Sequence, residues 1–494
     1  MSGDGGSGTG AAGGAAGGGA TEAVPGAADA RSSVLPGAPG GRSIAVLGLA
    51  RSGRAAAELA RAVGDRVYAS DGGDSPALRE AAAAVRRAGG EAEVGGHSAE
   101  RLAACDLVVV SPGIPPTAPI LADPRVARIP RISELEFAFR HLKSPVIAVT
   151  GTNGKSTTTA LASHLLRTAG LDAPAAGNIG LALSEVARRA SAPDWVVVEA
   201  SSFQLADIDT FAPRIGVVTN LAPDHLDRYR SVAAYYADKA RLFENASDVS
   251  RWVLNGEQPE VLALAGDAPG TRYLFRVRGA PAPGELGGFV TDGGELVLRT
   301  GAGETPLVHA SELRILGEHN RANALAAALA AVLAGADPDA VREGLRSFRA
   351  LSHRLEPIVE RDGVLWINDS KATNVESTRV ALRSMTRPTV LLLGGRHKGE
   401  PYTTLLPELR SHVRAVVAYG EAAPIVVDDL SAEVPVERVD GSFEDVVARA
   451  VALARPGDAV LLSPACASFD MFRDYEDRGR RFAALARGEE AHGA

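Results

Sequence analysis

The sequence predicts an α/β protein made of doubly wound parallel sheets behind an irregular N-terminal tail. Two observations predict this class: short apolar runs alternate with alanine-rich helical stretches, and several of these runs lead directly into glycine-containing or polar loops. The chain has 494 residues, which at roughly 150 residues per domain indicates about three domains. That length excludes a single small binding module.

Composition and charge exclude several classes of protein. Hydrophobic residues make up 46% of the chain and charged residues 23%, as in ordinary globular proteins. The net charge of −8 gives no global cationic field for nucleic acid or an anionic membrane, so we expect neither partner. Cys105 and Cys466 are too few for a disulfide framework, and we find no pattern of a signal peptide or apolar spanning segment. We therefore expect a cytoplasmic protein.

The N-terminal part contains a predicted tail and a predicted first domain. Residues 1–41 are more than half Gly and Ala without apolar periodicity, which predicts disorder. The domain expected over 42–133 opens as a βαβ unit. Its expected elements are strands at 44–47, 66–69 and 107–110 and a helix at 54–63.

The first glycine turn of this domain gives a weak dinucleotide signal. Residues 48–53 match G-x-G-x-x-G only if Ala50 replaces the middle glycine, and Asp71 fits loosely as the acidic residue expected about 20 positions later. A Rossmann dehydrogenase would also leave the phosphate loop of the next domain unexplained.

A second domain is expected over residues 134–350, and it contains the strongest motif. Thr150-Gly-Thr-Asn-Gly-Lys-Ser-Thr157 follows an apolar strand and opens a helix, where backbone N–H groups favour phosphate oxygens. Lys155 would neutralise the β/γ-phosphates and Ser156 would bind Mg²⁺. The motif is not a strict Walker A sequence because residue 149 is Val, so an ordinary glycine turn is the alternative. The expected elements are strands at 146–149, 195–198 and 215–218, helices at 156–168, 233–243 and 321–333, and a peripheral hairpin region at 267–304.

Further polar residues of this domain have both a functional and a structural interpretation. Glu199 follows the run 195–198, where a hard oxygen ligand is needed, and Asp224, His225 and Asp227 crowd a strand exit. Each also has a structural interpretation, since carboxylates often end strands and a single His is often structural. Lys239 lies on a helix, and composition alone favours a solvated surface lysine there.

A third α/β domain is expected over residues 351–494. Its strands are expected at 364–367, 390–393, 415–418 and 459–462. Polar loops at 368–374, 394–398 and 463–468 follow three of them. Because parallel strands end at one edge, a joint ligand site there is favoured over three separate turns.

These motifs, taken together, resemble the Mur ligases of peptidoglycan synthesis over residues 42–488. The loops at 368–374, 394–398 and 463–468 resemble those of the glutamate-adding member. The segments that carry the resemblance are GTNGKST, GNIG, EASSFQL, DHLDRY, GEHNRANALAA, SHRLE, NDSKATN, GGRHK and SPACASFD. The resemblance implies three domains: a Rossmann-like UDP-binding domain, a central P-loop ATPase domain and a C-terminal Rossmann-like domain.

The resemblance also implies an activity with its cofactors and partners. ATP would phosphorylate the carboxylate of UDP-N-acetylmuramoyl-L-alanine, and the amine of D-glutamate would attack the acyl phosphate. Two Mg²⁺ ions are implied, together with a carbamate formed from CO₂ on Lys239, and the enzyme would be a monomer. No covalent nucleophile is needed, so Cys466 is expected to be a packing residue.

Site residues are implied position by position. Lys155, Lys239 and His225 would be catalytic, and Ser156, Glu199, His225 and Lys239 as carbamate would bind metal. The ATP positions are Gly151, Thr152, Asn153, Gly154, Lys155, Ser156, Thr157, Asn320, Asn323, Arg354 and Asp369. The positions for the UDP-linked substrate are Arg51, Ser52, Asp71, Gly113, Asn178, Gln204 and His225. The amino-acid positions are Lys371, Thr373, Lys398, Ser468 and Tyr475.

One departure and several alternatives remain. Gly72 and Gly73 replace the polar or basic side chains that some relatives carry after Asp71, with Arg51 as a possible compensation. Another Mur or folylpolyglutamate ligase would share the ATP site but use a different acceptor. A non-catalytic relative is the alternative of another class, and the set of Lys155, Glu199, Lys239 and His225 disfavours it.

Overall fold

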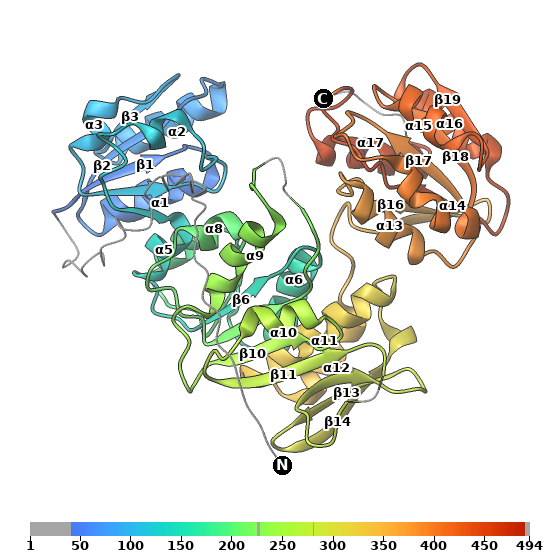
Figure 1. The fold of residues 1–494 in the computed structure, drawn as a ribbon, viewed down its shortest axis with the longest axis horizontal. Coiled ribbons are helices and arrows are strands. Elements are labelled where there is room, and N and C mark those ends of the chain that lie inside the picture. Colours follow the sequence, from blue (N-terminus) through green and yellow to red (C-terminus); the bar gives the residue numbers. More distant parts are fainter. Residues whose placement is uncertain (1–40, 225–227, 280, 490–494) are drawn as a thin grey trace, which may run out of the picture. The chain divides into compact units, whose positions relative to one another are not determined.

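The computed structural model describes residues 41–489 apart from 225–227 and 280. Within these residues the chain forms three sheets, whose strands span 43–133, 146–309 and 356–462 (Figure 1). The predicted α/β class is confirmed. Each sheet falls inside one predicted domain range, and the division into domains itself stays a prediction. Residues 1–40 of the predicted tail lie outside the described residues.

The first sheet is parallel and has the strand order β3-β2-β1-β4-β5. The strands that follow β1 are therefore added first on one side of β1 (β2, β3) and then on its other side (β4, β5). Helix α1 begins three residues before the predicted start at Arg54. Its elements are β1 (Ser43–Leu47), α1 (Arg51–Ala62), β2 (Arg66–Asp71), α2 (Pro76–Arg87), β3 (Glu91–Val94), α3 (Ala99–Ala103), β4 (Leu107–Val110), α4 (Pro119–Ala122) and β5 (Arg131–Ser133).

The second sheet has nine strands in the order β14-β13-β12-β11-β10-β9-β6-β8-β7. Its first elements in chain order are α5 (Glu134–Phe139), β6 (Val146–Thr150), α6 (Lys155–Thr168), β7 (Ala175–Gly177), α7 (Leu183–Ala187), β8 (Val196–Glu199), α8 (Ser202–Ala206), β9 (Ile215–Val218) and α9 (Val232–Ala240). The remainder are the 3₁₀ helix η1 (Arg241–Phe243), β10 (Arg251–Asn255), α10 (Pro259–Ala265), β11 (Thr271–Arg276), β12 (Gly287–Val290), β13 (Glu295–Thr300), β14 (Gly303–His309), the 3₁₀ helix η2 (Ala310–Glu312), α11 (Glu318–Leu333) and α12 (Pro338–Ser347).

Two predictions for this sheet need correction. The region 267–304 is not merely a peripheral hairpin, because β11 and β12 continue the parallel sheet and only β13 and β14 form an antiparallel edge. Its Gly and Pro residues obscured the apolar alternation in β11. Glu199 is the last residue of β8 rather than the residue after it.

Alternation of side chains along β6 places helices on both faces of this sheet. Ile147 and Val149 pack in a cluster with residues of α6 and α11, whereas Val146 and Ala148 pack in the cluster of the opposite face. Burial on both faces explains the uninterrupted apolar run that ends at the glycine loop. No helix in the described part of the chain is long and apolar enough to cross a membrane.

The third sheet has the order β15-β16-β20-β17-β18-β19, with only β15 antiparallel. The strands β16, β20 and β17 are neighbours, so the three polar loops that follow them meet at one edge, as predicted. The elements are β15 (Glu356–Arg361), β16 (Val364–Asn368), α13 (Val375–Arg383), β17 (Thr389–Gly394), the 3₁₀ helix η3 (Tyr402–Leu405), α14 (Leu406–His412), β18 (Val413–Tyr419), α15 (Ala423–Leu430), β19 (Val436–Val439), α16 (Phe443–Leu453), β20 (Ala459–Leu462) and α17 (Tyr475–Arg487).

Helix α1 packs closely against the glycine turn that precedes it. A Cβ added to Gly53 would lie 1.7 Å from the Gly48 carbonyl oxygen and 2.6 Å from Ser111 Oγ. We expect Gly53→Ala to lower the free energy of unfolding by at least about 2 kcal/mol, because backbone must move to relieve the overlap. Gly96→Ala is the control, since nothing lies within 4 Å of its added Cβ. Equal denaturation midpoints for both variants would contradict this account.

Candidate functional site

The loop between β6 and α6 has the shape that its glycines predict. Gly151 has φ +137° and Gly154 has φ +81° at the N-cap of α6, conformations that favour glycine. An added Cβ would lie 2.1 Å from Thr219 Oγ1 at Gly151 and 2.4 Å from Asn323 Oδ1 at Gly154. Both glycines are therefore required by conformation and by space.

Residues after β9 fix the loop in place. Asn220 accepts from Thr152 N at 2.8 Å through its carbonyl oxygen and from Asn153 N at 2.9 Å through Oδ1. Thr219 Oγ1 donates to the carbonyl oxygen of Asn153 at 2.6 Å. The loop is thus held in position before any ligand binds.

Two lysines converge on the carbonyl oxygen of Gly151. Lys155 Nζ donates to it at 3.0 Å and to Thr152 O at 2.7 Å, and Lys239 Nζ donates to it at 2.7 Å. Lys239 is 1% exposed and its Nζ lies 4.4 Å from the centre of the Tyr235 ring. The interpretation of Lys239 as a solvated surface lysine is therefore wrong. Burial, and next the charge of Lys155, hold the pKa of Lys239 well below its usual value.

Glu199 provides a carboxylate oxygen without a protein partner. Its Oε1 accepts from Asn178 Nδ2 at 2.8 Å, while buried Oε2 accepts no hydrogen bond from any described residue. An unsatisfied buried carboxylate oxygen at the end of β8 suits a hard cation such as Mg²⁺. Among the described residues no group of three or more His, Cys, Asp or Glu side chains forms a metal site. His225 and Asp227 lie outside the described residues.

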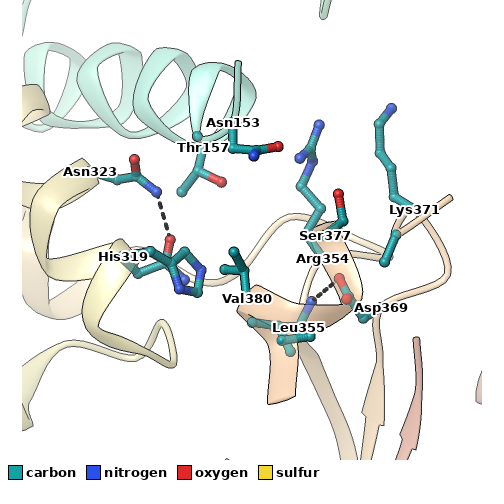
Figure 2. A pocket seen from close by; sticks show the side chains of 14 residues that line it. Asn153, Thr157, His319, Asn323, Arg354, Leu355, Asp369, Lys371, Ser377 and Val380 are labelled. Atoms are coloured by element: carbon teal, nitrogen blue, oxygen red, sulfur yellow. Dashed lines mark hydrogen bonds between the residues drawn. The ribbon is translucent and has the colours of Figure 1, made fainter. Parts of the chain in front are cut away.

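A pocket joins the phosphate loop to residues that precede β15 and residues that follow β16. Arg354 donates from NH2 to Ser156 Oγ at 2.7 Å, so the two predicted nucleotide residues meet directly. Figure 2 shows Asn153 and Thr157 facing Leu355, Asp369 and Val380 across this pocket, and the Arg354 and Lys371 side chains extending in the same direction. The lining residues are Asn153, Gly154, Thr157, His319, Asn320, Asn323, Arg354, Leu355, Asp369, Lys371, Ala372, Ser377, Val380 and Ala381.

Two predicted asparagines shape one end of the pocket, beside a histidine that sequence reasoning missed. Asn323 Nδ2 donates to Asn320 Oδ1 at 2.9 Å, and Asn320 Nδ2 donates to the Leu316 carbonyl at 2.7 Å. Burial lowers the pKa of His319 to about 4, so its ring is neutral near pH 7. His319 lies inside the quoted motif GEHNRANALAA, and that position was its only sequence signal.

Asp369 is buried at the exit of β16. Ser463 Oγ donates to Oδ2 at 2.8 Å and Leu355 N donates to Oδ1 at 3.1 Å. Burial raises the pKa of Asp369 to about 7 despite these donors. The side chain therefore sits near its titration midpoint at neutral pH.

Four of the residues predicted to bind the amino-acid substrate form two hydrogen-bonded pairs beside the third sheet. Lys371 Nζ donates to Tyr475 OH at 2.7 Å and lies 4.3 Å from the centre of its ring, and Lys398 Nζ donates to Thr373 Oγ1 at 3.4 Å. Burial, and next the charge of Arg354, lower the pKa of Lys371 to about 8. Ser468 is buried on the loop after β20.

Arg478 is a second residue that sequence reasoning missed. It is fully buried and donates to Ser370 Oγ at 3.0 Å, to Ser370 O at 2.8 Å and to Cys466 O at 3.2 Å. It thereby ties the loop after β16 to the loop after β20. Arginine in a helix carries no sequence signal of burial. Both cysteines are free and buried, and Tyr402 OH lies 2.8 Å from Cys466 Sγ, consistent with a packing role for Cys466.

Several residues predicted to bind the UDP-linked substrate lie around the β1–α1 turn and the end of β2, and others lie in the loop after β4 and on α8. Asp71 accepts from Leu49 N at 2.7 Å and from Gly73 N at 2.9 Å, so its carboxylate braces two loops. Arg51 NH1 donates to the Gly180 carbonyl at 2.6 Å. Ser52 lies in the first turn of α1, Gly113 lies in the loop after β4, and the Gln204 side chain forms a capping box with Ser201 at the start of α8.

The fold and site together define a class of α/β protein in which a glycine loop between a strand and a helix faces the cationic residues Arg354 and Lys371 across a pocket. The chain belongs to the Mur ligase family. The model of the Mur ligase middle domain matches residues 149–331, and that of the Mur ligase glutamate ligase domain matches residues 353–466.

Curated relatives match nearly the whole of their own length. A UDP-N-acetylmuramoylalanine–D-glutamate ligase of Salinibacter ruber is 44% identical over 89% of this chain and 96% of the relative. The protein of the same name from Anaeromyxobacter dehalogenans is 43% identical over 90% of this chain and 97% of the relative.

Solved structures share the fold at low sequence identity. A pseudomurein peptide ligase type C from Methanothermus fervidus aligns with a TM-score of 0.57 at 19% identity, covering 90% of this chain and 100% of that one. MurF from Acinetobacter baumannii aligns with a TM-score of 0.53 at 16% identity, covering 81% and 87%.

The raised pKa of Asp369 predicts a pH-dependent contribution to stability. Because its folded pKa of about 7 lies above its ordinary value of 3.8, the folded state holds a proton that the unfolded state releases between these values. The stability of the unsubstituted protein relative to Asp369→Asn should fall by about 1 kcal/mol per pH unit from pH 5 to 7, then level off. Asp292→Asn, at an exposed position, is the control. Denaturant unfolding that gave parallel pH profiles for all three proteins would contradict the assignment.

Proposed function

We propose that this chain is an ATP-dependent ligase that joins D-glutamate to UDP-N-acetylmuramoyl-L-alanine. The observation that carries the proposal is that the phosphate loop, Arg354 and Lys371 line the same pocket. The names of the curated relatives support the same substrates. The reaction belongs to the synthesis of peptidoglycan precursors. Because ATP and a UDP-linked sugar are cytoplasmic metabolites, we place it in the cytoplasm.

The proposed chemistry needs two successive displacements. A carboxylate has no good leaving group, so its oxygen first attacks the γ-phosphorus of ATP and ADP departs, giving an acyl phosphate. The amine nitrogen of glutamate then attacks the acyl carbon, phosphate leaves and the ammonium proton is released. Both steps place negative charge on phosphoryl oxygens, so positioning and charge neutralisation dominate catalysis.

The residues around the pocket suit these demands. Lys155 and the N–H groups at the start of α6 would bind the β/γ-phosphates. Arg354 would exchange its hydrogen bond with Ser156 Oγ for one with a phosphate oxygen, which frees that hydroxyl. Asp369 would contact the ribose end of ATP. Lys371 and Lys398, with their partners Tyr475 and Thr373, would bind the carboxylates of glutamate.

The donor set also suits magnesium. Ser156 and Glu199 are the nucleotide-side candidates, with Oε2 of Glu199 available, and His225 with a carbamylated Lys239 are the candidates for a second ion. When bound, Mg²⁺ would neutralise phosphoryl charge and orient the oxygens. The lowered pKa of Lys239 favours the neutral amine that reacts with CO₂, and the reaction would convert a buried cation into an anionic oxygen donor. We propose further that the enzyme works as a monomer.

Phosphate release tests the function directly. With ATP, Mg²⁺ and UDP-N-acetylmuramoyl-L-alanine, we expect sustained release only when D-glutamate is added, and a rate at least about 10²-fold lower for Lys155→Ala because a charge-stabilising donor is lost. L-glutamate, and the absence of an amino acid, are the controls. Preference for L-glutamate would overturn the assigned stereochemistry, release with neither enantiomer would overturn the acceptor, and a rate for Lys155→Ala within a few-fold of the parent would overturn the phosphate assignment.

Lys239 allows a separate test of the carbamate. We expect Lys239→Ala to be nearly inactive and to regain part of its activity when acetate or formate is added, because a small carboxylate can occupy the place of the lost carbamate. Arg230→Ala, at an exposed site just before the same helix, is the control. We expect it to keep the activity of the parent, and we expect added acetate not to change that activity. Full activity of Lys239→Ala without added carboxylate would show that no carbamate is needed.

A further inference from the structure

In the first sheet, each strand end is expected to contact a different part of a bound nucleotide. In doubly wound sheets the phosphates of a nucleotide bind near the helix that follows β1, and an acidic residue at the end of β2 faces the ribose. Asp71 ends β2, and β3 is the strand beyond it. The loop after β3, residues 95–98, is therefore the next set of groups available to a base attached to that ribose.

Side chains able to contact a base are scarce at the end of β2. Both carboxylate oxygens of Asp71 already accept backbone N–H groups, from Leu49 and Gly73. Gly72 and Gly73 carry no side chain. A side chain that hydrogen-bonds the base at this point is therefore expected from a neighbouring loop.

His97 occupies the position next to this gap. Its Nδ1 lies 2.8 Å from Oγ of Ser70, a fully buried residue of β2, and its Nε2 lies 3.5 Å from the place where a Cβ on Gly72 would stand. The loop itself is fixed, since Gly96 N donates to the Asp71 carbonyl at 3.1 Å. The half-buried ring thus fills the space that a side chain at position 72 would contact.

The chemistry of the anchored ring leaves one atom for a ligand. Burial lowers the pKa of His97, so the ring is neutral near pH 7. With Nδ1 engaged by Ser70, either tautomer presents one hydrogen-bonding atom at Nε2, and no described residue forms a hydrogen bond with that atom. The uracil edge offers carbonyl acceptors and one N–H donor, so it can pair with either tautomer.

We propose that His97, anchored by Ser70, hydrogen-bonds the uracil of the UDP-linked substrate through Nε2. This inference rests on the proposed function and adds a specificity-determining residue to it. The ring takes over the role that the missing side chains at Gly72 and Gly73 cannot perform.

Binding of UDP is the test, measured by calorimetry with the full chain and with the ATP site filled by a saturating nonhydrolysable ATP analogue. We expect His97→Ala to weaken UDP binding about tenfold, the effect of one lost hydrogen bond, and His97→Gln to lose less because its amide can still pair. The KM for the UDP-linked substrate should rise by the same factor while kcat and the KM values for ATP and glutamate stay within about twofold.

His164→Ala is the matched control. His164 is another half-buried histidine, with Nε2 2.9 Å from Ser347 Oγ, and its replacement should leave UDP affinity unchanged. UDP affinity of His97→Ala within twofold of the parent would overturn the inference, as would an equal loss for inorganic pyrophosphate, which carries no base. Failure of the unsubstituted protein to bind UDP would instead overturn the sugar-nucleotide part of the proposed function, and this inference with it.

Discussion

The sharing of one carbonyl oxygen by two buried lysine amines is the constraint on which the proposed chemistry depends. Lys155 and Lys239 both donate to Gly151 O, and because two positive charges this close in a poorly solvated place would repel each other, burial and the charge of Lys155 lower the pKa of Lys239. Nearby Glu199 and Asp224 offset part of that repulsion. The arrangement relaxes when an anion arrives or when one lysine loses its charge. In the proposed mechanism a phosphate group would supply the anion and a carbamate would remove the charge of Lys239, so both parts of the proposed chemistry would reduce the same repulsion.

The edge of the third sheet depends on a comparable buried charge. Arg478 holds the loops after β16 and β20 together through Ser370 and Cys466, and its guanidinium makes no ion pair with a described carboxylate. A buried cation costs free energy unless hydrogen bonds and nearby negative charge compensate it. The carboxylates of the proposed amino-acid substrate would bring such charge to the same loops. The charge that fixes the loops therefore also favours the ligand that they are proposed to bind.

Much of the fold could be predicted because local pattern and tertiary structure agree. The strand before Gly151 is apolar from Val146 to Val149 because both of its faces are covered, and parallel order follows from the alternation of strands and helices. The phosphate loop could be predicted because its glycines are required by backbone conformation. The family resemblance placed Lys239 in the site, whereas composition alone placed it on the surface, since burial of a lysine depends on the loop that packs over it.

Residues that act through tertiary contacts were the ones that sequence could not reveal. Arg478 and His97 lie in segments without a chemical motif, and only packing gives each a partner. Arg354 illustrates the same limit: the motif SHRLE assigns it to phosphates, while the structure pairs it with Ser156 Oγ. Because a phosphate oxygen is a stronger acceptor for a guanidinium than a neutral hydroxyl, nucleotide binding would draw Arg354 from that hydroxyl. The same exchange would free Ser156 for a metal ion, so in the proposed mechanism the binding of the nucleotide and of its metal ion would be coupled through one arginine.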